Sequence, residues 1–198
     1  MLHCDATRLS AQLNSKSLGD PTGGNSLATI RRAEVRDAPA LAELAERTFR
    51  DAFGHANRPE DMDLHCQSFY GTQRLVREVA DPETTTLVCE YDGVLVGYGQ
   101  LRWDAPPACV VGARPAEVQR LYVDRQYHGK GTAQALMAAL VEAAVAGAGD
   151  VLWLGVWEHN PRAIAFYAKA GFREVGEQVF VLGRDPQRDV VLTKTLDS

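Results

Sequence analysis

The sequence has few cysteines, and its four, Cys4, Cys66, Cys89 and Cys109, are scattered along the chain. None forms a Cys-x-x-Cys pair or a Cys/His cluster at metal spacing, so we expect no metal site. Cys89 lies in an apolar run, which predicts a packed thiol in a reducing compartment. No apolar run is long enough to span a membrane, and the N-terminus lacks a signal-peptide core. We therefore expect a cytoplasmic protein without a membrane partner.

An excess of basic residues is also missing. The chain carries 21 Lys and Arg against 26 Asp and Glu, a formal net charge of −5. Nucleic-acid binders usually carry a basic surface, so we expect no nucleic-acid partner. The Walker, dinucleotide and nucleophile-elbow motifs (GxxxxGK[ST], GxGxxG and GxSxG) are absent as well. Their absence argues against P-loop nucleotide enzymes, Rossmann enzymes and serine hydrolases.

The 198 residues suit one domain, and 45% of them are apolar, enough to bury a core. Residues 1–27 are polar and end in a turn-rich stretch, which predicts a poorly ordered N-terminal extension. Residues 28–198 are expected to form a single domain. Periodicity and turn residues predict strands at 28–33, 84–91, 94–102, 117–123, 151–157, 172–182 and 189–196, and helices at 37–49, 59–70, 72–79, 132–146 and 160–170. This order predicts a mixed α/β fold with one βαβ unit between antiparallel strands.

The most informative segment is residues 123–132, Val-Asp-Arg-Gln-Tyr-His-Gly-Lys-Gly-Thr, where a strand passes through a turn into a helix. Gly129 and Gly131 allow the backbone to approach a bulky anion, because they carry no Cβ. The free amides and dipole of a helix N-terminus attract such an anion. The segment therefore has the features of a pyrophosphate site, although Gly-x-Gly alone is also common in structural turns.

The spacing Gln-x-x-Gly-x-Gly after a strand resembles the coenzyme-A signature of the GCN5-related N-acetyltransferases (GNAT). Residues 117–123 resemble that family's central strand, and residues 160–172 resemble its Asn-x-x-Ala-x-x-Phe-Tyr-x-Lys-x-Gly-Phe block. The resemblance covers residues 28–198. It implies a mixed, mostly antiparallel sheet with a splayed pair of strands and flanking helices. It also implies an enzyme that transfers an acetyl group from acetyl-CoA to an amine, directly and in a ternary complex.

The family comparison also implies roles for individual residues. Tyr167 would protonate the departing thiolate, since a phenol stays protonated at neutral pH; a packing role on its helix is the alternative. Asn160 would contact the cofactor or only cap its helix, and Lys169 would meet a phosphate or only be exposed. The implied cofactor-binding residues are Leu121, Tyr122, Val123, Gln126, His128, Gly129, Lys130, Gly131, Thr132, Asn160 and Lys169.

A reacting amine must lose a proton, and Glu117 is the favoured base. Strand alternation predicts that Glu117 shares a face with Gln119, Leu121 and Val123. Glu117 could instead bind a cationic acceptor, or pair with Arg114 or Arg120. The histidines are alternative bases: His55, His65, His128 and His159.

Four further stretches, 49–53, 58–62, 153–158 and 183–196, resemble the PaiA-type polyamine acetyltransferases within this family. They imply a small-molecule amine acceptor such as spermidine or spermine, with Asp51 and Glu60 as candidates for attracting it. A protein N-terminus, an amino acid and an antibiotic amine stay open as acceptors, as does a non-catalytic CoA-binding module. The family often forms homodimers, but no segment here decides the oligomeric state.

Overall fold

The computed structural model describes residues 16–18 and 28–196. The strands are β1 (Lys16–Leu18), β2 (Ala28–Arg32), β3 (Thr84–Tyr91), β4 (Val94–Arg102), β5 (Pro115–Val123), β6 (Val151–Trp157), β7 (Arg173–Leu182) and β8 (Asp185–Thr195). The helices are α1 (Ala38–Phe53), α2 (Pro59–Phe69), α3 (Thr72–Ala80), α4 (Thr132–Ala146) and α5 (Pro161–Lys169), with short 3₁₀ turns η1 (Val35–Asp37) and η2 (Arg125–Tyr127). β1 lies inside the expected N-terminal extension, and the rest of that extension lies outside the described residues.

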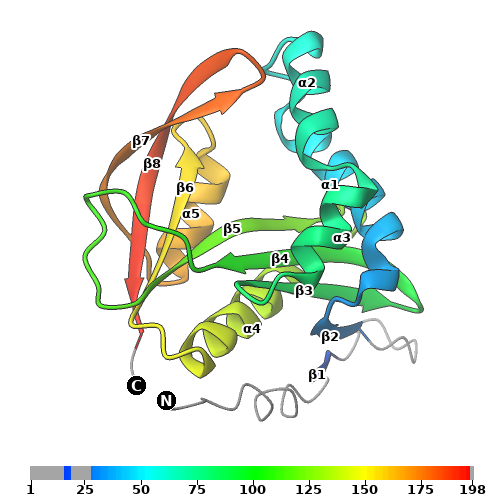
Figure 1. The fold of residues 1–198 in the computed structure, drawn as a ribbon, viewed down its shortest axis with the longest axis horizontal. Coiled ribbons are helices and arrows are strands. Elements are labelled where there is room, and N and C mark those ends of the chain that lie inside the picture. Colours follow the sequence, from blue (N-terminus) through cyan, green and yellow to red (C-terminus); the bar gives the residue numbers. More distant parts are fainter. Residues whose placement is uncertain (1–15, 19–27, 197–198) are drawn as a thin grey trace, which may run out of the picture.

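The described strands form one sheet in the order β1-β2-β3-β4-β5-β6-β8-β7. All neighbours run antiparallel except β5 and β6, which are parallel and joined through α4. This parallel pair is short, because only residues 115–117 pair with residues 151–153. Beyond these residues the strands separate, β5 staying paired with β4 and β6 with β8. Figure 1 shows the two strands diverging from their paired ends. The splayed pair that the sequence implied is therefore present.

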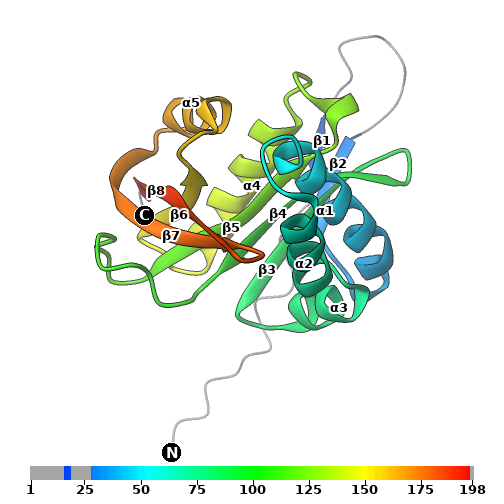
Figure 2. The same cartoon turned by 90° about the horizontal axis from the view of Figure 1, so that it is seen from above.

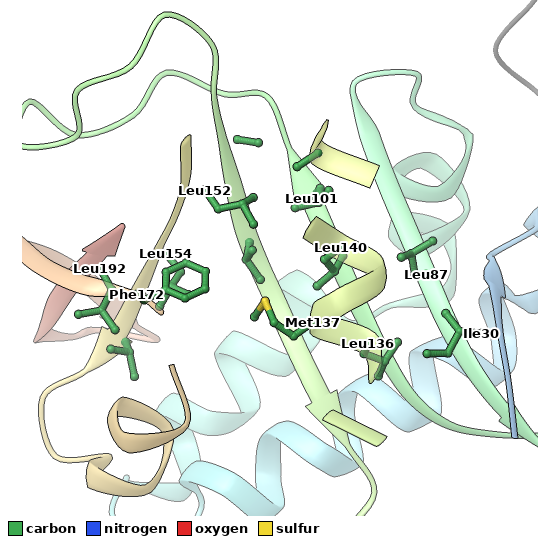
Figure 3. Close-up of a cluster of buried hydrophobic side chains, with 14 of the residues drawn as sticks. Ile30, Leu87, Leu101, Leu136, Met137, Leu140, Leu152, Leu154, Phe172 and Leu192 are labelled. Atoms are coloured by element: carbon green, nitrogen blue, oxygen red, sulfur yellow. The ribbon is translucent and has the colours of Figure 1, made fainter. Parts of the chain in front are cut away.

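Helices cover both faces of the sheet. One core lies under α4 and α5, where Leu136 and Leu140 pack toward Leu87 and Leu101 (Figure 3). The other core lies under α1, α2 and α3 and includes Leu41 and Tyr98. Figure 2 shows α1–α3 gathered on one side of the molecule and α5 at the other. The divergence of β5 and β6 thus opens between two helical layers.

The expected β3–β4 hairpin is confirmed. Its turn residues Asp92 and Gly93 have φ angles of 49° and 78°, as a type I′ turn requires. The glycines of β4 allow close approach of α4: a Cβ on Gly99 would lie 2.7 Å from Leu140 Cδ1. The strand pairing also shifts register between Cys89 and Glu90, so the hairpin contains a bulge beside Gly97.

One boundary differs clearly from the expectation. The last strand begins at Asp185 and not at 189, because Gly183 and Arg184 form a tight turn that lets β8 pair with β7 at once. The polar run Asp-Pro-Gln-Arg at 185–188 has the composition of a loop, but edge pairing with β7 holds it in the sheet. This extension gives β7 and β8 a long hairpin that reaches toward α2 (Figure 1).

Candidate active site

A cleft of about 1160 Å³ lies where β5 and β6 diverge. Its walls come from β5, the η2 turn, the start of α4, the end of β6 and α5. The C-terminal half of α1 and the β7–β8 hairpin complete the lining. Strands that separate leave backbone N–H and C=O groups facing the gap without a neighbouring strand. The cleft can therefore take an extended ligand that bonds to the strand edge.

A bulge interrupts the alternation of β5. Ala116 and Val118 pack in the core under α4, whereas Arg120 and Tyr122 face the opposite helical layer. The pairing with β4 shifts register around Gln119, which is the extra residue. Such a bulge re-aims every side chain that comes after it.

The bulge corrects one expectation. Glu117 does not share a face with Leu121 and Val123, because those two side chains pack toward the α4 core. Glu117 precedes the bulge and lies on the face of α1, together with Tyr122. The Oε1 atom of Gln119 is buried without a hydrogen-bond partner in the described chain, and this residue lines the cleft. Its amide therefore offers an acceptor to a ligand.

The turn before α4 has the geometry expected of an anion site. Gly129 and Gly131 have φ angles of 78° and 83°, a region that favours glycine. Gly131 is the N-cap of α4, so the amides of Thr132 and the next two residues have no partner within the helix. These amides and the helix dipole can hold a pyrophosphate. Arg125 in the η2 turn and Arg162 in the first turn of α5 also line the cleft and add positive charge.

Some backbone amides of this turn form hydrogen bonds within the turn itself. The amides of Gln126, Tyr127 and His128 donate to Asp124 Oδ1, Asp124 O and Arg125 O, over 3.0, 2.8 and 3.3 Å. The His128 ring Nε2 lies 2.9 Å from Val123 O, and it must carry a proton because a carbonyl only accepts. His128 thus fastens the turn to the end of β5.

The structure brings most of the sequence-predicted residues to the cleft, but not all of them. Leu121, Tyr122, Val123, His128, Gly129, Gly131, Thr132, Asn160, Glu117 and Tyr167 line it. Gln126, Lys130 and Lys169 do not belong to its lining. Lys130 Nζ lies 4.8 Å from the centre of the Tyr127 ring, and Lys169 is exposed in the last turn of α5. A role for these three residues in cofactor binding stays a prediction.

Helix α5 carries two of the predicted residues. Asn160 caps it, and its Oδ1 accepts from the Ala163 amide over 3.1 Å. Tyr167 lies about two turns further along the helix. Its ring packs edge-on against Phe166 and Phe172, with ring centroids 5.3 and 5.7 Å away. Burial raises the pKa of Tyr167 to about 12, so its phenol is a proton donor at any physiological pH.

Glu117 has the properties of a base. Arg120, proposed as its partner, instead forms an ion pair with Glu78, and Arg114 donates to Gly147 O. No described residue forms a hydrogen bond or ion pair with the Glu117 carboxylate. Burial raises its pKa to about 7, opposed by the charge of Arg102. A carboxylate with this pKa can both accept and release a proton near neutral pH.

The histidines divide between structure and cleft. His65 is stacked between Phe49 and Phe69, with ring centroids 4.4 and 4.6 Å away, and burial lowers its pKa to about 4. It is a core residue. His55 and His159 line the cleft. His159 packs edge-on against Trp157, at 5.3 Å between ring centroids.

Sequence reasoning missed several polar side chains of the cleft, among them Gln178 on β7 and Asp189 on β8. Asp189 is only 7% exposed, and burial raises its pKa to about 6. The available signal was its place directly before the continuous apolar run Val190–Leu192, which is typical of a strand buried on both faces. In the described chain, no cluster of His, Cys, Asp and Glu could hold a metal. No helix there is long and apolar enough to cross a bilayer.

Sequence comparison identifies known proteins to which this chain is similar. A family model described as the acetyltransferase (GNAT) family matches residues 38–172. An uncharacterised N-acetyltransferase of Lactobacillus delbrueckii subsp. lactis is 35% identical over 167 residues, covering 84% of this chain and 96% of that protein. The N-alpha-acetyltransferase RimI of Mycobacterium tuberculosis is 32% identical over 133 residues, covering 63% and 78%.

Structural comparison agrees. The PaiA N-acetyltransferase of Thermoplasma acidophilum, solved in complex with coenzyme A, has a TM-score of 0.68 and is 20% identical. The comparison covers 85% of this chain and 98% of that one. At this identity the likeness concerns the fold alone.

Proposed function

Since the chain belongs to the GNAT family of acetyltransferases, and is an N-acetyltransferase that uses acetyl-CoA, we propose that it acetylates a primary amine of a polyamine such as spermidine or spermine. The observation that supports a cationic acceptor is the set of acidic side chains in the cleft away from the turn before α4. Three carboxylates line it, those of Asp51, Glu117 and Asp189. No lysine lines it in the described chain, and Arg120 is neutralised by Glu78. Such a cleft attracts a cation.

Acetyl-CoA supplies an activated acyl group as a thioester. Its phosphates bind at Gly129, Gly131 and the first amides of α4. The backbone of Leu121–Val123, at the unpaired edge of β5, forms hydrogen bonds with the pantetheine arm that leads to the thioester. Asn160, already the cap of α5, keeps its amide nitrogen for the same arm.

Glu117 and Tyr167 divide the proton transfers between them. Glu117 removes a proton from the ammonium group, directly or through water, so that the nitrogen can form the new C–N bond. Tyr167 gives its proton to the sulfur as the C–S bond breaks. The nitrogen loses its second proton as the amide forms, and this proton restores the Tyr167 phenol, directly or through water. A carboxylate with a pKa of about 7 and a phenol with a pKa of about 12 are in the right protonation states for these steps at neutral pH.

A peptide N-terminus is the second candidate acceptor. Its support is the likeness to RimI, named an N-alpha-acetyltransferase, at 32% identity. A peptide would also enter as a cation, so the carboxylates do not distinguish it from a polyamine. The two candidates differ in the group attached to the reacting nitrogen, which is a flexible cationic chain in a polyamine and a peptide backbone in a protein.

The test is release of free thiol from acetyl-CoA with separate acceptors: spermidine, spermine, lysine and a peptide with a free N-terminus. We expect fast release with the polyamines and slow release with the others. The mass of the product identifies the acetylated amine. Fast release with the peptide alone would replace the polyamine by the second candidate. Tight coenzyme binding without release for any amine would contradict both and favour a non-catalytic CoA-binding module.

A further inference from the structure

Asp189 is a buried carboxylate for which the described chain provides no counter-charge. Its exposed fraction is 7%, and no described residue forms a hydrogen bond or ion pair with its side chain. Burial raises its pKa to about 6, and no neighbouring cation offsets this effect. Buried charges in proteins are normally paired. Because Asp189 also lines the cleft, a ligand can provide the missing partner.

The residues around Asp189 leave room for its side chain and place an aromatic ring near it. Gly155 lies in the middle of β6, where glycine weakens a strand. A Cβ at this position would lie 2.4 Å from Gln178 Nε2 and 2.9 Å from Asp189 Oδ2, so the glycine makes room for both side chains. Trp157, directly opposite Asp189 on β6, contributes an aromatic wall to the cleft. A carboxylate beside aromatic surface suits an organic ammonium group.

Asp189 is distant from Glu117 but lies on the same face of the sheet. Glu117 is opposite Trp153 on β6, and Asp189 is opposite Trp157 on the other side of that strand. Four residues along a strand and two strand spacings across the sheet place the two Cα atoms roughly 16 Å apart. Asp189 therefore cannot contact the same nitrogen as Glu117.

We propose that Asp189, next to Gln178, binds a second ammonium group of the acceptor while Glu117 takes the proton of the reacting one. The site then selects long diamines and polyamines over monoamines. This inference rests on the proposed function, because it takes Glu117 as the base and an amine as the acceptor. Asp189 on β8 would thus recognise the ammonium group of the acceptor that does not react.

The test compares diaminooctane with aminooctanol, which has the same length and a neutral polar end. Steady-state KM and kcat are measured for the wild type, for Asp189→Asn, and for Glu174→Gln as a matched control. Glu174 is an exposed carboxylate on β7 away from the cleft lining. We expect a wild-type preference for the diamine, and a KM for the diamine about 30-fold higher in Asp189→Asn, the scale of one lost charge-assisted bond. The KM for aminooctanol should not change, and Glu174→Gln should behave as the wild type.

Two outcomes would overturn the inference: equal KM values for both acceptors in the wild type, or the same loss for both in Asp189→Asn. In either case acetylation itself would still be observed, so the proposed function would stand. If no amine is acetylated by the wild type, the proposed function fails. A thermal melt at pH 8 checks folding. Asp189→Asn should be at least as stable as the wild type there, because the substitution removes a buried, unpaired charge.

Discussion

Replacing Glu117 by Gln tests the assignment of the base through pH. In the wild type, burial places the pKa of this carboxylate at about 7, against an ordinary value of 4.5. An ordinary glutamate would be almost fully ionised at pH 6, whereas only about one-tenth of Glu117 is. We expect kcat/KM to fall about tenfold per pH unit below 7, since only the ionised form accepts a proton.

Glu117→Gln should remove this limb and lower kcat/KM by about 10²- to 10⁴-fold, the usual contribution of a general base. The assay is thiol release at saturating acetyl-CoA from pH 5 to pH 9, with CoA affinity measured in parallel as a control. A limb at the ordinary pKa of a glutamate, or a Gln variant with nearly full activity, would refute the reasoning.

The same burial affects folding with a defined sign. Because the pKa of Glu117 is higher in the folded protein, its stabilising contribution is complete below about pH 4.5 and is lost as the pH rises through about 7. The Asp189 carboxylate acts in the same direction, and its stabilising contribution is lost as the pH rises through about 6. Urea unfolding of the wild type and of Glu117→Gln should therefore converge at low pH, with the variant more stable above neutrality.

Two further substitutions test the phosphate turn and the buried ion pair. Gly131→Ala forces alanine to a φ of 83°, which should lower the free energy of unfolding by about 1 kcal/mol. It should also weaken CoA binding, which calorimetry measures. An unchanged affinity would mean that this turn does not hold the cofactor. Glu78→Ala leaves the buried Arg120 guanidinium without its partner, so urea denaturation should show a loss of about 3–5 kcal/mol. A loss below about 1 kcal/mol would show that Arg120 finds another partner or water.

Local patterns predicted much of the fold. The Asp92-Gly93 pair separates two β-prone segments and so defined the β3–β4 hairpin, and the Ala/Leu-rich segment defined α4 at its observed bounds. These elements are determined by turn chemistry and side-chain period, which are properties of neighbouring residues. The start of β8 at Asp185 was missed because pairing with β7, a tertiary contact, overrides a loop-like composition.

The site was predictable where a local motif specifies it, as at Gly129, Gly131 and Asn160. The prediction that Glu117 shares a face with Leu121 and Val123 was wrong, because the bulge at Gln119 reverses the faces of the side chains that follow it. A bulge leaves no clear signal in a single sequence. The partner of Arg120 was also hidden, since Glu78 is 42 residues away. Asp189 was missed for a related reason: only the folded sheet brings β8 next to the gap between β5 and β6.

The proposed acetyl transfer depends most directly on Tyr167 as the proton donor to sulfur, and Tyr167→Phe isolates that role. The phenylalanine keeps the ring that packs against Phe166 and Phe172, so only the hydroxyl is lost. We predict that kcat for spermidine acetylation falls about 10²- to 10³-fold, while the Kd for CoA, measured by calorimetry, does not change. A variant that retains its kcat, or that loses kcat and CoA affinity together, would contradict this role and leave Tyr167 as a packing residue of α5.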